Sequence, residues 1–211
     1  MLTLKNVEGK IEVTASGEIE VAPDEAIIKL DIITEAKTAT AAVQANAKRA
    51  QSVIDAVAQE PNHGVTTSGL AVGPIYKFDP ETNTSMIIGF RATNSIKIMT
   101  KPGYAGQIFD AGIRAGANQS SGISFRLQNE SFYREEALRM AVKNAFAEAR
   151  VVANTADVKL DGPRSIEIDP SYAPILFRAE QFSADAASTP VIPEDVMIRA
   201  NVRMVFQTRI S

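Results

Sequence analysis

The chain has 211 residues, of which 45% are hydrophobic and 22% are charged, and its formal net charge at pH 7 is −3. These proportions are typical of a soluble globular protein that is long enough to bury a substantial core. Acidic and basic residues are mixed along the chain, so the sequence has no broad basic region of the kind that binds nucleic acid. Cysteine is absent, which excludes disulfide bonds, thiol catalysis and thiolate metal sites.

The N-terminus has no apolar run of the length that a signal peptide requires, and no later stretch is long and apolar enough to span a membrane. We therefore expect residues 1–9 to be an N-terminal extension and the remainder to have no membrane span. A chain whose export signal had been removed would have the same sequence, so export stays open on this observation.

Residues 10–21 alternate between apolar and polar side chains, which predicts a strand with one face in solvent. Pro23 and Asp24 interrupt the alternation, and residues 25–36 resume it, so the two strands are expected to form a hairpin. The solvent face of the first strand carries three acidic residues: Glu12, Glu18 and Glu20.

Thr38 is expected to cap a helix that ends at about Gln59. Asn46 lies within the apolar face of this helix, and the commonest role for a buried amide of that kind is a structural hydrogen bond to the backbone. Two long strands follow, over residues 65–78 and 86–100, joined by the turn-rich sequence DPETNTS. Tyr76 and Phe78 share one face of this hairpin, and we interpret them as core or interface residues.

A helix is predicted over residues 104–115, then a short strand over 122–128, then the longest helix over 131–157, which Ser131 is expected to cap. One face of the longest helix is apolar and small, which predicts that the helix lies close against a sheet. Alanine recurs along the helix at positions 137, 141, 145, 149 and 153, and the predicted face consists of Leu138, Ala141, Val142, Ala145, Phe146, Ala149, Val152, Ala153 and Ala156.

Gly162 and Pro163 precede a predicted strand over residues 164–172. The next segment, 173–194, is long for a loop in a compact domain. It contains clustered large apolar residues, which we expect to pack either on another subunit or on the same domain: Ile175, Leu176, Phe177 and Phe182. The chain ends in a strand over residues 196–207, whose polar face carries Arg199 and Arg203. If this strand neighbours the first one, within a chain or between chains, the basic and acidic rows are complementary.

The segment IEVTASGEIEVAPDEAIIKLDI resembles the opening of SIMPL-domain proteins, a bacterial envelope family that includes outer-membrane and periplasmic immunogenic antigens. The likeness continues through VTTSGLAVGPIYKF, GFRATNSIKI, GANQSSGISFRLQN and EALRMAVKNAFAEARVVA, and it spans residues 10–209. No single one of these motifs is specific, and their ordered succession carries the resemblance.

The resemblance implies an α+β domain, residence in the periplasm or at the outer membrane, and self-assembly. Some members of the family are linked to defence against oxidative stress, and the family has no established catalytic residues to transfer. Members normally carry an export signal, which this chain lacks, so a cytoplasmic location also stays open.

The sequence contains no convergent set of residues that would indicate catalysis or metal binding. His63 is the one histidine, and it has neither a second histidine nor a cysteine with which to hold a metal. Three carboxylate pairs flank predicted turns, where aspartate is favoured for local bonding to the backbone: Asp24 with Glu25, Asp79 with Glu81, and Glu194 with Asp195. The glycines do not have the spacing of a nucleotide-binding loop. We therefore expect no catalytic, cofactor-binding or metal-binding residues, and no enzymatic activity.

Together these patterns predict one α+β domain over residues 10–209, with a mostly antiparallel sheet of about seven strands, helices on one face and the order ββα, ββα, βα, ββ. The expected function is that of a non-enzymatic cell-envelope protein that works through homo-oligomeric assembly, in a ring or a channel-like particle, with peripheral association with the envelope. The residues expected at its contacts are Arg199, Arg203, Glu12, Glu18, Glu20, Ile175, Leu176, Phe177 and Phe182. The alternative is a module that binds a small ligand or a peptide at an exposed sheet edge, and an enzyme ranks third.

Overall fold

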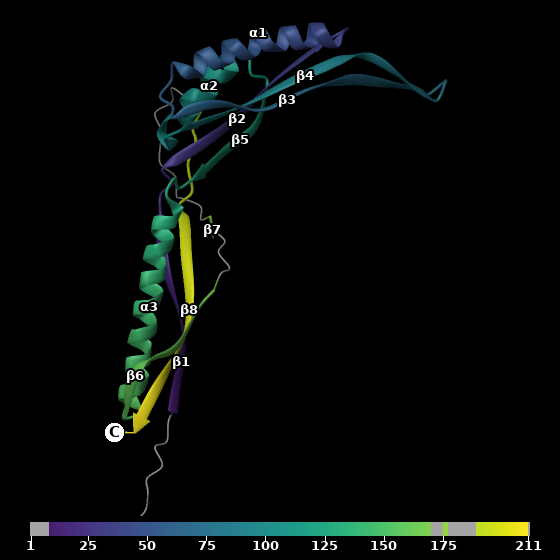
Figure 1. The fold of residues 1–211 in the computed structure, drawn as a ribbon. Coiled ribbons are helices and arrows are strands. Elements are labelled where there is room, and N and C mark those ends of the chain that lie inside the picture. Colours follow the sequence, from purple (N-terminus) through teal and green to yellow (C-terminus); the bar gives the residue numbers. More distant parts are fainter. Residues whose placement is uncertain (1–8, 170–174, 177–188, 211) are drawn as a thin grey trace, which may run out of the picture. The chain divides into compact units, whose positions relative to one another are not determined.

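A computed structural model describes residues 9–169, 175–176 and 189–210. The predicted α+β class and the order ββα, ββα, βα, ββ are confirmed, with one additional strand of two residues, β7 (Ile175–Leu176), before the last strand. The described strands are antiparallel, and they divide between two sheets instead of forming one. Figure 1 shows helices packed against both sheets.

The chain forms two compact units, each built around one of the two sheets. The prediction of a single domain over residues 10–209 stays a prediction. The described residues of the first unit lie within Met1–Ala22, Gln128–Arg178 and Glu194–Ser211, and those of the second lie within Pro23–Leu127 and Ala179–Pro193.

In the first unit the central strand is β8 (Val196–Ile210). It pairs along one edge with β1 (Gly9–Val21), and along the other edge with β6 (Val158–Ile168) and β7. Alternate residues of β8 face α3 (Glu130–Thr155), and this periodicity of two is what the sequence pattern predicts. The ring of Phe206 packs edge-on against Phe146 of the helix, with 5.1 Å between ring centroids.

The small residues of α3 allow the helix to lie close to β1. All five alanines of the repeated spacing are buried, whereas Val152 and Ala156 of the predicted face are exposed, because they lie in the last turn of the helix or just after it. On the strand side the matching small residue is Gly17. A Cβ atom at Gly17 would overlap the carbonyl oxygen of Ala137 and lie 2.6 Å from the backbone nitrogen of Ala141. The close approach of helix and strand therefore needs small residues on both.

In the second unit the strand order is β3 (Gly64–Asp79), β4 (Thr84–Thr100), β2 (Glu25–Ala36), β5 (Gln119–Arg126). Two helices contact one face of this sheet, α1 (Ala39–Ala58) and α2 (Ala105–Ala115), and a short 3₁₀ helix, η1 (Pro102–Tyr104), precedes α2. The core between helices and sheet contains larger side chains than that of the first unit, among them Ile28, Leu30, Ile32, Val53, Val57, Ile96, Ile98 and Ile108.

Two local predictions about the helices are confirmed. Thr38 caps α1, because its side chain accepts a hydrogen bond of 3.2 Å from the backbone nitrogen of Ala41. Asn46 is buried, and its amide donates hydrogen bonds of 2.7 Å to the carbonyl oxygen of Ile32 and 3.0 Å to that of Ala92. Asn46 therefore ties α1 to two neighbouring strands of the sheet.

Three local predictions are wrong. The strands β1 and β2 do not form a hairpin, because β4 and β5 occupy both edges of β2. Ser131 does not cap α3, since the cap is Asn129, whose side chain accepts a hydrogen bond of 3.3 Å from the backbone nitrogen of Phe132. The dipeptide Gly162–Pro163 does not precede the strand, because β6 begins at Val158 and passes through the dipeptide with local shifts of register. An edge strand tolerates proline and a bulge in this way.

Candidate functional site

The hairpin of β3 and β4 extends beyond the rest of its sheet. The last residue pair between β4 and β2 is Phe90 with Ala36, whereas the pairing of β4 with β3 continues to Thr84 with Asp79. We call residues 75–88 the hairpin arm. Within the described residues the arm is a ribbon of two strands, and Figure 1 shows it projecting past β2. A two-stranded ribbon on its own has marginal stability in water.

The hairpin arm exposes large apolar side chains. The exposed fractions are 61% for Tyr76, 57% for Phe78, 55% for Met86, 55% for Ile87 and 44% for Ile88. An irregularity in the pairing after Ile75 places Tyr76 opposite Ile87. Phe78 follows two residues later and so lies on the same face of the ribbon. We call Tyr76, Phe78 and Ile87 the apolar stripe.

The apolar stripe continues the sheet face that α1 covers. Val72 lies four residues before Tyr76 on the same strand and pairs with Ala92 of β4. Ala92 is buried, and its carbonyl oxygen accepts the hydrogen bond from Asn46 of α1. One sheet face is thus covered by a helix near Ala92 and exposed in the arm. An exposed apolar patch of this kind usually marks an interaction surface.

The sequence predicted that Tyr76 and Phe78 are core or interface residues. Their exposure places both outside the core of the second unit, so an interface role stays a prediction. The exposure of these two residues could not be predicted because it depends on where β2 ends. Nothing in the pattern of β3 and β4 shows that their neighbour ends at Ala36 and leaves the arm uncovered.

A shallow groove of about 450 Å³ lies along the same hairpin at the base of the arm, and Gly73, Tyr76 and Arg91 contribute to its lining. Arg91 pairs with Glu35 of β2, with 2.7 Å between nitrogen and oxygen. The groove borders β3, which is an edge strand. An edge strand with an adjoining groove can accept an extended peptide.

The predicted acidic and basic rows meet within one chain. Because β1 and β8 are antiparallel neighbours, Glu18 pairs with Arg199 at 2.6 Å and Glu12 pairs with Arg203. The hydrogen bond from Arg203, and then its positive charge, lower the pKa of Glu12 below its usual value. Such exposed pairs contribute little to stability. A role of these residues between chains stays a prediction.

The remaining predicted contact residues differ in how far the structure describes them. Glu20 is exposed on β1, where its partner in register is Met197. Ile175 and Leu176 form β7 and pair with β8. Phe177 and Phe182 lie outside the described residues. Later in the same predicted loop, Thr189 donates hydrogen bonds from its backbone nitrogen and its hydroxyl to Asp110 of α2, at 2.9 and 2.6 Å, so this part of the loop contacts its own unit.

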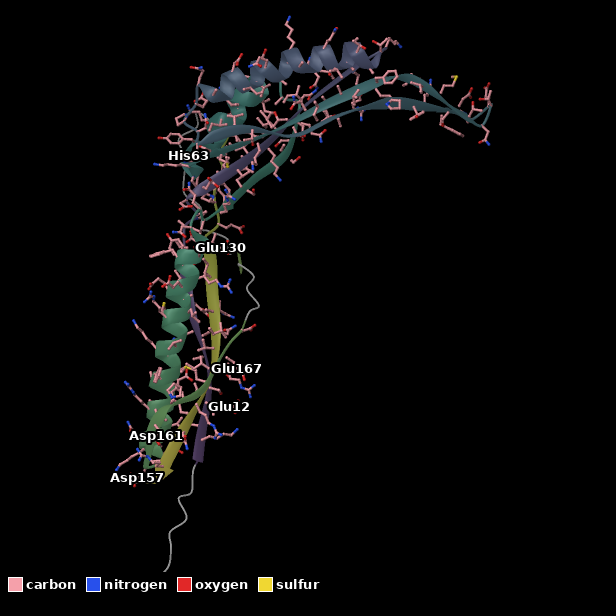
Figure 2. The ribbon with its side chains drawn as sticks, in the orientation of Figure 1. Glu12, His63, Glu130, Asp157, Asp161 and Glu167 are labelled. Atoms are coloured by element: carbon pink, nitrogen blue, oxygen red, sulfur yellow. The ribbon has the colours of Figure 1, made fainter. Side chains whose placement is uncertain are left out.

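The carboxylates of the first unit are spread along it. Figure 2 shows Glu130 and Asp157 at opposite ends of α3, and Glu12 and Glu167 beside the strands. Glu12 and Glu167 line a depression of about 700 Å³ together with Arg203. Among the described residues no group of three or more His, Asp or Glu side chains is placed to hold a metal ion.

The single histidine and the turn carboxylates have local roles. His63 is exposed in the turn before β3, and its backbone nitrogen donates a hydrogen bond of 2.7 Å to the carbonyl oxygen of Met99. Asp79 accepts a hydrogen bond of 3.0 Å from the backbone nitrogen of Glu81, which is the local bonding that the turn sequence predicted. Glu25 is buried and pairs with Arg126 between β2 and β5.

A polar cluster around Asp31 was not predicted from the sequence. This carboxylate is only 7% exposed, and it accepts hydrogen bonds from the hydroxyls of Ser95 on β4 and Ser121 on β5. A shift of register between β2 and β5 directs Ser121 toward it. The cluster joins three adjacent strands. The available signal was an aspartate between the apolar residues Leu30 and Ile32 of β2.

Comparison with known proteins adds a family. Residues 11–206 match SIMPL, described as a protein of unknown function (DUF541). The chain is 29% identical to the 26 kDa periplasmic immunogenic protein of Brucella melitensis, over 95% of this chain and 85% of that protein. It is 23% identical to the uncharacterized protein YggE of Escherichia coli, over 92% of this chain and 78% of that protein. Within the described residues, no helix is long and apolar enough to cross a membrane.

Proposed function

This chain belongs to the SIMPL family, and from that premise we propose that it is a non-enzymatic protein of the bacterial cell envelope that acts through homo-oligomeric assembly. The observation that carries the proposal is the apolar stripe of the hairpin arm. Tyr76, Phe78 and Ile87 are each more than half exposed, on a ribbon that has no third strand within the described residues. Association with other copies would bury these side chains and support the ribbon.

The printed name of the Brucella relative supports the envelope part of the proposal, because that protein is described as periplasmic and the two chains align over most of their lengths. Edge strands support the assembly part. Within the described residues, each sheet has a long edge strand, which is β1 in the first unit and β3 in the second. Closed assemblies satisfy such edges, which otherwise promote uncontrolled association. A closed ring or channel-like particle is the form of assembly that we favour.

The proposal is tested by the mass of the protein in solution, measured by light scattering across a micromolar concentration series. We expect an oligomer. In the double variant Tyr76→Ser/Ile87→Ser, which removes two side chains of the apolar stripe, we expect the mass to fall toward that of a monomer while the midpoint of thermal unfolding measured on the dilute monomer stays unchanged.

The matched control is Val151→Ser/Val152→Ser on α3, where both side chains are exposed, at 66% and 48%. This variant should keep the mass of the unmodified protein. A monomeric unmodified protein at every concentration would refute assembly, and an equal loss of mass in both variants would show that the apolar stripe has no special role.

The second candidate is a binding module that holds a peptide or a small ligand at the β3 edge, and the groove beside Gly73 and Arg91 favours it. This candidate predicts a monomer or a dimer whose mass does not depend on the apolar stripe. Substitution of Arg91 by Glu would then abolish ligand binding in a screen of extended peptides, whereas the assembly proposal predicts no binding to lose.

A further inference from the structure

The hairpin arm has an open backbone edge as well as an apolar stripe. β3 is the edge strand of its sheet along its whole length, because its described pairing is with β4 alone. Such an edge presents backbone N–H and C=O groups that a second strand can bind. Residues 75–79 are the part of this edge that lies in the arm, and their side chains determine which strand fits there.

We propose that the hairpin arm pairs with the arm of a second copy of this chain, edge to edge at the end of β3, antiparallel, about a two-fold axis that passes between the two copies of Phe78. The proposal rests on the proposed function, since it specifies which surface joins two copies and in which register. Two copies related by a two-fold axis use the same patch on both sides, so the patch must be complementary to itself.

The charges at the end of β3 favour one register. In an antiparallel pair, directly opposite side chains share a face, so a two-fold axis perpendicular to the ribbon must place one residue opposite its own copy. With the axis at Lys77 or at Asp79, like charges would be opposite each other. With the axis at Tyr76, Lys77 would face Ile75. With the axis at Phe78, each Lys77 lies opposite the Asp79 of the other copy.

The side chains around Asp79 suit this arrangement. Lys77 is exposed and Asp79 is partly exposed, so both can reach a partner strand. The backbone nitrogen of Glu81 bonds one oxygen of Asp79, at 3.0 Å, which limits the rotation of that carboxylate and keeps it at the end of the strand. Opposite charges that face each other across two strands stabilise the pair, and like charges destabilise it.

The same register joins the apolar stripes. Phe78 meets the Phe78 of the other copy, and Tyr76 lies on the same face in both copies. Because β3 ends at Asp79, this register places residues 77–79 of the two copies opposite each other, and over these residues the strand order is β4, β3, β3, β4. The contact adds strands at the tip of each ribbon, and a ribbon of two strands has marginal stability on its own.

The experiment uses the absence of cysteine from the chain, so that every disulfide formed comes from the introduced residue. Opposite residues in an antiparallel pair have Cα atoms about 4.5–5.5 Å apart, which is within the reach of a disulfide. In Phe78→Cys the two copies of the substituted residue should be opposite each other, and mild oxidation should give a covalent dimer.

The matched control is Tyr76→Cys, which lies on the same strand and face with a similar exposed fraction. In the proposed register its two copies are offset by four residues along the strands, or roughly 13 Å, which is beyond the reach of a disulfide. We expect Phe78→Cys to cross-link at least about tenfold faster than Tyr76→Cys. A mixture of Lys77→Cys and Asp79→Cys should also cross-link, faster than either variant alone.

A second set of variants tests the charges without removing apolar contacts. Lys77→Asp and Asp79→Lys should each weaken the arm contact, raising its dissociation constant about tenfold, because each creates two repulsive pairs across the axis. The double variant Lys77→Asp/Asp79→Lys restores opposite charges and should recover assembly. Lys29→Asp, which changes an exposed lysine on β2, should have no effect.

The outcomes separate this inference from the proposed function. A monomeric unmodified protein would refute assembly as a whole. An oligomeric protein in which Phe78→Cys cross-links no faster than Tyr76→Cys, and in which the charge exchange does not recover assembly, would keep the proposed function and overturn the β3 register. A cross-link that Tyr76→Cys forms faster than Phe78→Cys would move the axis away from Phe78 and would overturn it equally.

Discussion

α3 and the hairpin arm show two opposite treatments of an apolar sheet face. Under α3 the face of β1 and β8 is covered so closely that Gly17 and five alanines are required at the contact. In the arm, Tyr76 and Phe78 lie on a face that nothing covers within the described residues. Side chains at a helix–sheet contact are therefore constrained by fit to their own chain, whereas those of the arm are free to be selected for fit to a partner.

The largest expected effect is at the closest point of the covered region. Gly17→Val should lower the free energy of unfolding by about 3 kcal/mol or more. The added atoms would overlap the backbone of α3, which cannot move aside as a flexible side chain could. Chemical denaturation measures the change. Gly73→Ala is the control, since a Cβ there meets nothing within 4 Å. Equal stability of the two variants would show that α3 does not lie against Gly17.

A smaller effect is expected on the helix side of the same contact. Ala145→Leu or Ala149→Leu should lower the free energy of unfolding by about 1–3 kcal/mol through overpacking. Ala147 lies on the exposed side of α3. Ala147→Leu should therefore change the free energy of unfolding by less than about 0.5 kcal/mol. Thermal unfolding of the three variants decides the matter, and a loss of stability in Ala147→Leu alone would mean that the buried face is misassigned.

A comparable loss is expected from Asp31 in the second unit. Asp31→Ala leaves the hydroxyls of Ser95 and Ser121 without their acceptor and should cost about 1–3 kcal/mol. The triple variant Asp31→Ala/Ser95→Ala/Ser121→Ala should recover part of this loss, because it removes the unpaired donors too. Denaturation curves that show a further loss in the triple variant would contradict a cluster of this kind.

The smallest effect concerns the exposed pair of Glu12 and Arg203. Because Arg203 lowers the pKa of Glu12 in the folded chain, the pair stabilises the fold above the usual glutamate pKa and the contribution is lost as the pH falls through the lowered pKa. Titration of Glu12 by NMR should therefore give a midpoint below 4.5, which Arg203→Gln should raise. Arg199→Gln should leave it unchanged, and an unshifted midpoint in Arg203→Gln would exclude the pairing.

Local patterns predicted most of the secondary structure. The alternation in β8 and the alanine spacing in α3 depend on the two periods of the backbone, and the cap at Thr38 depends on residues three positions apart. The errors arose where two polar residues compete or where pairing partners are distant. Asn129 and Ser131 both suit a helix cap, and in the structure the helix begins at Glu130, directly after Asn129. The predicted β1–β2 hairpin is absent because β2 pairs with β4 and β5 instead.

The candidate surfaces divide in the same way. The complementary rows on β1 and β8 could be predicted, since charge patterns on two strands are visible in the sequence, but their meeting within one chain is a result of topology. The cluster at Asp31 brings together residues 31, 95 and 121, and no spacing rule connects positions so far apart.

By itself, the sequence determined the fold class, the order of elements, the buried face of α3 and the likeness to the SIMPL family, because each of these depends on local periodicity or on the succession of segments. Only the tertiary structure decided that the strands form two sheets, that Gly17 receives the helix, and that β2 ends before the hairpin arm does. These features depend on which strands compete for the same edges and how far each one extends, and such long-range choices have no period in the sequence.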